Sequence, residues 1–388
     1  MYAGVIYNYR RGNGISTRVI TKETFKNIYI NELNVVSYLK KYLVKYYECR
    51  DDLWPVVQNL QELLQKTAVM RFNSLSSYDR NDIINRHLFS DKFLLDFFWI
   101  KELPSLKILL AYHKLAELLR TCVYQPILAG SAISHAESKD GVVNPLTMDL
   151  FARKIQRDDV GDNISEKNRT LNELTCIYWA WKNYDKIGNP AFFGFGHYRR
   201  FFIFDDSLPL PNKTWLPNGS TYCFSNMQEA LPYINEEYCF KLLKDYDCLV
   251  TKMYDDIYTS KKKTTMKLSY VLHGQGELDP ELYDLMEKLV LSKYPDYREE
   301  VDFFKTSSRH YFCNMFVFPK ILFFKYCEFL FSIIFDINNK CSSNLVEGAR
   351  APGYIAEYLT SMFISHNRKL GLYRFKELNT AFLEDTEI

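Results

Sequence analysis

Two arginines stand together at the end of a short apolar run, and their types and spacing favour binding of an anion. The run covers residues 192–196 and leads into His197-Tyr198-Arg199-Arg200. Ligands of open α/β sheets bind beyond the carboxyl ends of strands, so the arginines fall where a ligand is expected. Guanidinium groups pair with phosphate oxygens in bidentate geometry. We therefore interpret the cluster as a phosphate site. The alternative is that one arginine only pairs with Asp205 or Asp206.

Three carboxylates are candidates for a general base, which needs a side chain that accepts a proton from a hydroxyl group. Asp162 lies in a polar loop, where catalytic groups are common. Glu357 lies in an apolar helical segment. Glu173 completes the pattern Thr170-x-x-Glu173, a capping box that on its own accounts for the residue. We predict Asp162 as a sugar contact and Glu357 as a base or a structural anchor.

Apolar spacing indicates the elements that must hold these groups. Residues 106–110 and 192–196 are short apolar runs typical of buried parallel strands. Between them, the apolar residues of segment 171–181 recur at helical spacing. Trp179 and Trp181 on this helix face different directions, so we predict that both pack in the core. Strands alternating with helices predict an α/β fold.

Further elements follow along the chain. They are predicted as strands at 247–252 and 312–318, and as helices that begin at Asp279, Pro319 and Gly353. Asp245-Tyr246-Asp247 spells the Asp-x-Asp pattern of metal-dependent enzymes, but it precedes a strand, so we predict a structural role. The stretch 311–335 is interrupted by charges at Lys325 and Glu328, which favours a core helix. A helix on a membrane surface is the alternative.

Composition limits the class of protein. A net charge of +2 over 388 residues argues against binding of nucleic acid by bulk electrostatics. The nine cysteines form no Cys-x-x-Cys pair, which suits reduced thiols in a cytosol. The segment from Met1 has no apolar core of a signal peptide, so we expect a cytoplasmic protein. The length predicts two units, a helical accessory region at 1–104 and a main domain at 105–388.

Five long segments resemble a known family. They are VGDNISEKN (160–168), ELTCIYWAWKN (173–183), GFGHYRRFF (194–202), YFCNMFVFPKILFFKYCEFLF (311–331) and GYIAEYL (353–359). In this order and spacing they look like a bacterial family of capsular and exopolysaccharide glycosyltransferases, formerly catalogued as a domain of unknown function. Some members resemble galactofuranosyltransferases. The resemblance covers roughly residues 105–370.

The resemblance implies a Rossmann-like glycosyltransferase fold of the A type and a nucleotide-sugar donor. Implied donor-binding residues are Tyr112, His113, Lys114, Asn163, Ser165, Tyr198, Arg199 and Arg200. Implied acceptor-side residues are His273 and Asn314, and implied catalytic residues are Asp162, His197 and Glu357. The His-Tyr-Arg-Arg cluster occupies the place where many such enzymes keep an Asp-x-Asp metal motif. Dependence on Mn²⁺ or Mg²⁺ is therefore left open, since two arginines can stabilise a diphosphate directly.

We therefore expect a hexosyltransferase that uses a uridine-diphosphate sugar, such as UDP-galactofuranose. The acceptor is expected to be a polysaccharide or lipid-linked glycan of capsule, exopolysaccharide or O-antigen synthesis, with the enzyme at the inner face of the membrane. One alternative is a non-catalytic carbohydrate- or nucleotide-binding module of a polysaccharide assembly complex. A membrane-surface scaffold that uses residues 319–335 and Lys261–Lys263 is another.

Overall fold

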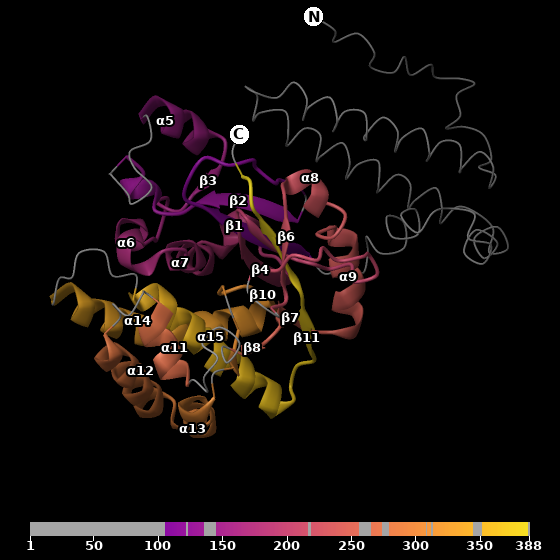
Figure 1. Cartoon of the computed structure of the whole chain (residues 1–388). Coiled ribbons are helices and arrows are strands. Elements are labelled where there is room, and N and C mark those ends of the chain that lie inside the picture. Colours follow the sequence, from indigo (N-terminus) through magenta and orange to yellow (C-terminus); the bar gives the residue numbers. More distant parts are fainter. Residues whose placement is uncertain are drawn as a thin grey trace, which may run out of the picture. The chain divides into compact units, whose positions relative to one another are not determined.

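The computed structural model describes residues 105–386, apart from 122, 136–144, 216–218, 256–264, 274–278, 308, 312 and 344–350 (Figure 1). The chain divides into two compact units, Met1–Leu103 and Pro104–Ile388. The helical accessory region expected at 1–104, and the basic run Lys261–Lys263, lie outside the described residues and stay predictions.

A mixed sheet forms the centre of the described unit. Its main path runs β11-β7-β10-β4-β1-β2-β3. These strands are β1 (Leu106–Tyr112), β2 (Tyr124–Leu128), β3 (Gln156–Arg157), β4 (Phe192–His197), β7 (Cys248–Thr251), β10 (Phe316–Pro319) and β11 (Phe375–Leu378). Strand β10 runs antiparallel to both of its neighbours, whereas the pairs β1–β2, β1–β4, β2–β3 and β7–β11 are parallel. The carboxyl ends of β1, β2, β4 and β7 therefore meet the amino end of β10 at one edge.

Side chains alternate between the two faces of this sheet, because successive residues of a strand point to opposite sides. Phe193, Phe195 and Phe316 belong to one core cluster. Leu249 and Val317 belong to the other. His197 follows Phe195 by two positions, so it shares the face of the first cluster.

Helices cover the first face, where α11 to α15 gather on one side of the sheet (Figure 1). This layer contains α6 (Asn168–Leu171), α7 (Leu174–Lys182), α11 (Met266–His273), α12 (Pro280–Lys293), α13 (Arg298–Thr306), α14 (Lys320–Ser343) and α15 (Ala351–Leu370). The second face packs against α5 (Pro145–Arg153), α8 (Met227–Ala230), α9 (Glu236–Asp245) and the strands β5 (Arg200–Phe202), β6 (Thr221–Phe224) and β12 (Thr380–Leu383). A separate ribbon pairs β8 (Tyr254–Asp255) with β9 (Arg309–His310).

The elements expected from apolar spacing are confirmed in their central parts. Strands β1, β4 and β7 and helices α12, α14 and α15 overlap the predicted segments. Trp179 is fully buried and Trp181 stacks on Phe331 with centroids 5.8 Å apart, so both tryptophans pack in the core. Asp247 pairs with Arg374, in agreement with its predicted structural role. Among the described helices, none is long and apolar enough to cross a membrane.

The capping box predicted at Thr170 and Glu173 is wrong. Helix α7 begins only at Leu174, after a break at Asn172, whose φ is 49°. The Thr170 hydroxyl donates to the Lys167 carbonyl and to Asn338 instead of capping α7. Glu173 accepts a hydrogen bond from Asn314, so its carboxylate is not explained by helix capping.

The strand expected at 312–318 is shorter than predicted. It begins at Phe316, because Cys313 and Asn314 have φ values of 72° and 48° and form a left-handed turn before it. This backbone conformation is uncommon for residues other than glycine. It places both residues at the sheet edge next to the end of β4.

Candidate active site

Five side chains converge where β4 and β10 meet helices α7 and α15. This edge cluster consists of Glu173, His197, Cys313, Asn314 and Glu357. His197 Nε2 lies 2.6 Å from the Cys313 carbonyl oxygen, which requires the imidazole proton to be on Nε2. Asn314 Nδ2 donates to Glu173 Oε1 at 2.9 Å. The backbone of Cys313 also hydrogen bonds to Glu357.

Helix α15 reaches the edge cluster because a glycine lets it approach the start of α7. A Cβ atom at Gly353 would lie 2.2 Å from Asn172 Nδ2. Glu357 follows Gly353 by four residues and therefore lies on the same side of α15. Asn314 is fixed from the same helix, since Thr360 Oγ1 donates to its Oδ1 at 2.9 Å. The spacing of the Gly-Tyr-Ile-Ala-Glu segment thus places a carboxylate beside Glu173.

The pKa of Glu357 is raised to about 8, chiefly by burial and then by the negative charge of Glu173. The backbone hydrogen bond from Cys313 and the positive charge of Arg200 act in the opposite direction. As a whole residue, Glu357 is half-buried. A partly accessible carboxyl group that titrates near neutral pH has the properties of a general base.

His197 and Cys313, two further titratable groups of the edge cluster, are uncharged near neutral pH. Burial lowers the pKa of His197, and the nearby Arg200 and Arg199 add to this effect, while Glu173 opposes it. Burial raises the pKa of the Cys313 thiol to about 12. The site therefore presents a neutral imidazole and a thiol that is not ionised, and Cys313 is a poor nucleophile.

The two arginines lie close to one aromatic ring. The guanidinium carbons of Arg199 and Arg200 lie 5.0 and 5.3 Å from the centroid of Phe382 in β12. Arg200 also lies 4.8 Å from the ring of Trp215, which stacks on Phe382. Cross-strand pairing fixes this arrangement, because Arg200 is opposite His197 in β4 and opposite Phe382 in β12.

Neither arginine makes an ion pair with a carboxylate among the residues that the structure describes. The Nε atoms of Arg199 and Arg200 are buried without a hydrogen-bond partner there. Asp205 is engaged elsewhere, since its carboxylate accepts from the backbone and hydroxyl of Ser207. The alternative in which Asp205 neutralises an arginine is therefore not seen. Two positive charges are available for an anion next to the edge cluster.

The turn after β1 lies beside the turn after β4, and Tyr198 joins them. Its ring centroid lies 5.1 Å from that of His113, and Lys114 Nζ lies 5.7 Å from the Tyr198 ring. Arg199 lies on the same ring, at 5.6 Å. Tyr112 differs from its neighbours. It is fully buried and its hydroxyl bonds to backbone atoms of 117 and 119, so its side chain has a structural role here.

The loop 158–165 is held by a buried carboxylate. Asp158 accepts from the backbone N–H groups of Gly130 and Ser131, both at 2.9 Å. Ser165 Oγ and Thr175 Oγ1 donate to the same carboxylate at 2.5 and 2.6 Å. This network ties the loops after β2 and β3 to α7. Ser165 is consequently buried and uses its hydroxyl within the protein.

Asn163 and Asp162 lie further out on this loop. The Asn163 side chain bonds to the backbone of Asp159, Gly161 and Ser165, so it shapes the loop. Asp162 is exposed and accepts from the hydroxyl of Tyr178 at 3.1 Å. In the described part of the chain, no hydrogen bond or ion pair joins Asp162 to the edge cluster. The position of Asp162 therefore favours a contact with the sugar from the loop over a role as the general base.

Of the predicted site residues, the structure brings together His197, Arg199, Arg200, Asn314 and Glu357. His273 is the last residue of α11, and the position of its side chain lies outside what the structure describes. Sequence reasoning did not single out Phe382 and Trp215, and it assigned Glu173 to helix capping. The membership of Glu173 in the segment ELTCIYWAWKN was the available signal.

A divalent metal does not fit the end of β4. Two guanidinium groups there would repel a cation, since like charges at short range raise the energy. Within the described ranges, no group of three or more His, Cys, Asp or Glu side chains is placed to hold a metal ion. We therefore assign no role in sugar transfer to a metal.

Comparison with known proteins agrees with this architecture. Among solved structures the chain is similar to one described as the apo structure of WbbM, a bifunctional glycosyltransferase. The two share 28% sequence identity with a TM-score of 0.60, and the match covers 73% of this chain and 46% of that one. The chain therefore spans less than half of that protein. No curated protein matches the chain.

The α/β architecture, its parallel-dominated sheet and the structural match define a Rossmann-like fold of the glycosyltransferase A type. Residues 107–368 match the family described as Domain of unknown function (DUF4422), and the chain belongs to this family. The match begins in β1 and ends in α15, so it contains the edge cluster and both arginines. Phe382 differs in this respect, since β12 follows the matched region.

Proposed function

We propose that this chain is a hexosyltransferase that moves a sugar from a nucleotide-diphosphate donor to a glycan acceptor. The expected donor is a uridine-diphosphate sugar such as UDP-galactofuranose. The expected acceptor is a polysaccharide or lipid-linked glycan of capsule, exopolysaccharide or O-antigen synthesis at the cytoplasmic face of the membrane. The observation that carries the proposal is a pair of arginines that make no ion pair with any described residue, beside a carboxyl group with a raised pKa.

The arginines bind the diphosphate. Breaking the bond between sugar and nucleotide leaves negative charge on the leaving phosphate, and Arg199 and Arg200 stabilise it as it develops. Removal of one such preorganised donor typically costs about 3–4 kcal/mol in the transition state. Both guanidinium groups are held by Phe382 before the donor arrives, so little reorganisation is needed. His113, Lys114 and Tyr198 lie beside them and complete the donor side.

Glu357 removes the proton from the acceptor hydroxyl as that oxygen attacks the anomeric carbon. The attacking oxygen forms the new glycosidic bond while the bond to the diphosphate breaks, and the proton moves to Glu357. His197 holds the turn at Cys313 through its Nε2 hydrogen bond and keeps a neutral ring at the donor sugar. Asn314 positions Glu173, whose charge keeps the pKa of Glu357 high.

Release of uridine diphosphate from a panel of uridine-diphosphate hexoses, with glycan acceptors present, tests the proposal. Arg200→Ala should lower kcat/KM by about 10²–10³-fold, the usual effect of losing one such donor. Arg298→Ala is the matched control, because Arg298 is an exposed arginine on α13. Activity of Arg200→Ala equal to that of the control would contradict the phosphate role. Binding of uridine diphosphate without turnover of any sugar would favour the non-catalytic binding module.

Chelation tests the role of the arginines separately. If guanidinium groups supply the positive charge, turnover should persist in excess chelator. Loss of activity that Mn²⁺ or Mg²⁺ restores would assign the charge to a metal and refute this part of the proposal.

A further inference from the structure

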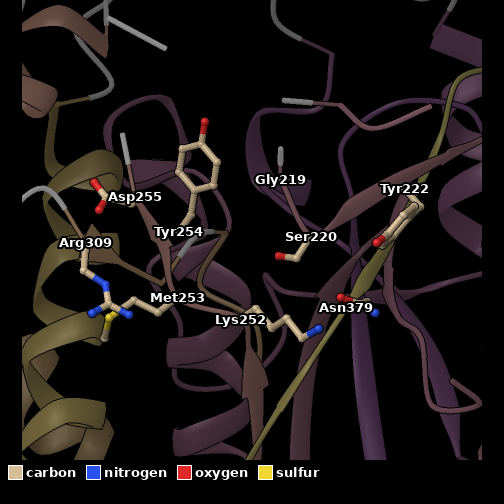
Figure 2. A pocket seen from close by; sticks show the side chains of 9 residues that line it. All are labelled: Gly219, Ser220, Tyr222, Lys252, Met253, Tyr254, Asp255, Arg309 and Asn379. Carbon is tan, nitrogen blue, oxygen red and sulfur yellow. The ribbon is translucent and has the colours of Figure 1, made fainter. Parts of the chain in front are cut away.

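A polar pocket lies at the same edge of the sheet as the edge cluster. Its residues have no part in the proposed transfer of the sugar. It has a volume of about 450 Å³, within the range of small-ligand sites. Figure 2 shows the residues that line it, which are Gly219, Ser220, Tyr222, Lys252, Met253, Tyr254, Asp255, Arg309 and Asn379. They come from the ends of β7 and β11, from the start of β6 and from the ribbon β8–β9.

The register of the sheet places this pocket next to the edge cluster. Val250, Phe316 and Phe195 form one row across β7, β10 and β4. His197 is the last residue of β4 and Lys252 directly follows the last residue of β7, each two residues beyond that row. Both residues therefore lie at the same edge of the sheet. Two strand spacings separate Lys252 from His197, which corresponds to about 10 Å.

The charges of the pocket favour an anion. Lys252 and Arg309 are both exposed, and neither makes an ion pair among the described residues. Figure 2 shows the Lys252 amine pointing toward Asn379, with Arg309 on the other side of the pocket near Asp255. Asp255 is the one carboxylate of the lining, and it has an interaction of its own. The two cations exceed this single negative charge, and Ser220, Tyr222 and Asn379 add neutral hydrogen-bonding groups.

We propose that this pocket binds the glycan acceptor through an anionic group, a phosphate or a carboxylate, one or two sugars away from the reacting hydroxyl. The inference rests on the proposed function, since it takes the edge cluster as the point of transfer. Lys252 binds the anion, Arg309 adds positive charge on the other side of the pocket, and the neutral side chains hydrogen bond to sugar hydroxyls. The separation of about 10 Å from His197 leaves room for the end of the acceptor between the pocket and Glu357.

Titration of the full chain with small saccharides, followed by NMR, tests this assignment. Uridine diphosphate is kept at saturation so that Arg199 and Arg200 are occupied. The probes are glucose 6-phosphate, methyl glucuronide and the neutral methyl glucoside. We expect the charged probes to bind more tightly than the neutral one. The charged probe with the higher affinity identifies phosphate or carboxylate as the preferred group.

Lys252→Gln should weaken binding of the charged probe by about 10-fold, the equivalent of one charge-assisted hydrogen bond, and Arg309→Gln should weaken it by less, because Arg309 acts from the other side of the pocket. Their affinity for uridine diphosphate should not change. Lys288→Gln on α12 is the matched control, because Lys288 is an exposed lysine outside both sites. Equal affinity of wild type and variants for the charged probes, or equal binding of the neutral probe, would overturn the inference.

Failure of the proposed function gives a different result. If uridine diphosphate does not bind the wild type, the donor assignment is lost, whereas the comparison of Lys252→Gln and Arg309→Gln with Lys288→Gln still decides the pocket. Competition between glucose 6-phosphate and uridine diphosphate would place the probe at the donor arginines and overturn the pocket assignment.

Discussion

Replacement of Glu357 by glutamine tests the base directly, because it removes the proton-accepting group and keeps the shape of the side chain. The pKa of Glu357 is about 8, so only about a tenth of the free wild-type enzyme is in the active, deprotonated form at pH 7. The kcat/KM of the wild type should therefore rise about tenfold per pH unit below 7 and level off above pH 8 to 9. In Glu357→Gln, kcat should fall by about 10²–10⁴-fold, the usual contribution of a general base.

The assay is the pH profile of donor turnover at low substrate concentration between pH 5.5 and 9.5. Under these conditions kcat/KM reports the titration of the free enzyme. The affinity for uridine diphosphate is measured in parallel by calorimetry and should be close to that of the wild type at pH 7. A fall in turnover with intact donor binding separates the loss of the base from a collapse of the site.

Glu173→Gln is the companion variant. The negative charge of Glu173 is the second largest cause of the raised pKa of Glu357. Its removal should lower that pKa, so the rising limb of the profile should move to lower pH while activity is kept. A profile of the wild type that does not change between pH 6 and 8, or a Glu357→Gln enzyme with normal kcat, would refute the assignment of Glu357 as the base.

Three further predictions follow from the same geometry. Gly353→Ala should leave the melting temperature unchanged or slightly lower, because the Asn172 side chain must turn away from a new Cβ that would lie 2.2 Å from its Nδ2. This cost offsets the gain of about 1 kcal/mol that alanine normally has over glycine in a helix. Calorimetry should show a higher melting temperature when Asn172→Gly is added, and a single variant more stable than the wild type would disprove the close approach. Phe382→Leu should weaken the binding of uridine diphosphate by roughly 3–10-fold in titration calorimetry, since each cation–π contact contributes about 0.5–2 kcal/mol to holding Arg199 and Arg200. Unchanged affinity would show that the ring does not position the two arginines. Glu357→Gln should be more stable than the wild type at pH 9 by about 1–3 kcal/mol, allowing for partial exposure, and close to it in stability at pH 4. A carboxyl group with a raised pKa stabilises the fold below its unfolded pKa, and this contribution is lost as the pH rises through 8. Thermal melts at both pH values measure the difference in stability, and an equal difference at both would contradict the raised pKa.

Much of the fold could be predicted from the sequence because its elements depend on local patterns. The apolar run that became β1 and the Asp-Pro start of α12 are signals carried within a few residues. The structure confirms the cap of α12, where Asp279 accepts from the backbone N–H of Glu281. The position of the two arginines after β4 follows from the same kind of reasoning, since the end of a strand is visible in the sequence.

The parts that could not be predicted depend on contacts between distant segments. A capping box is a local rule, and Glu173 departs from it, since its carboxylate accepts a hydrogen bond from Asn314, 141 residues away in the sequence. The left-handed turn at Cys313 and Asn314 has no glycine to announce it. The pocket around Lys252 and Arg309 is assembled from four segments, none of which carries a motif.

Strand β12 couples the arginine pair to the integrity of the core. Phe382 lies far along the chain from Arg199 and Arg200, and it reaches them only when β12 has joined β5 and β6. The same strand adds Ala381 and Leu383 to the second core cluster. A chain without β12 would therefore lose part of its core together with the aromatic support of both guanidinium groups.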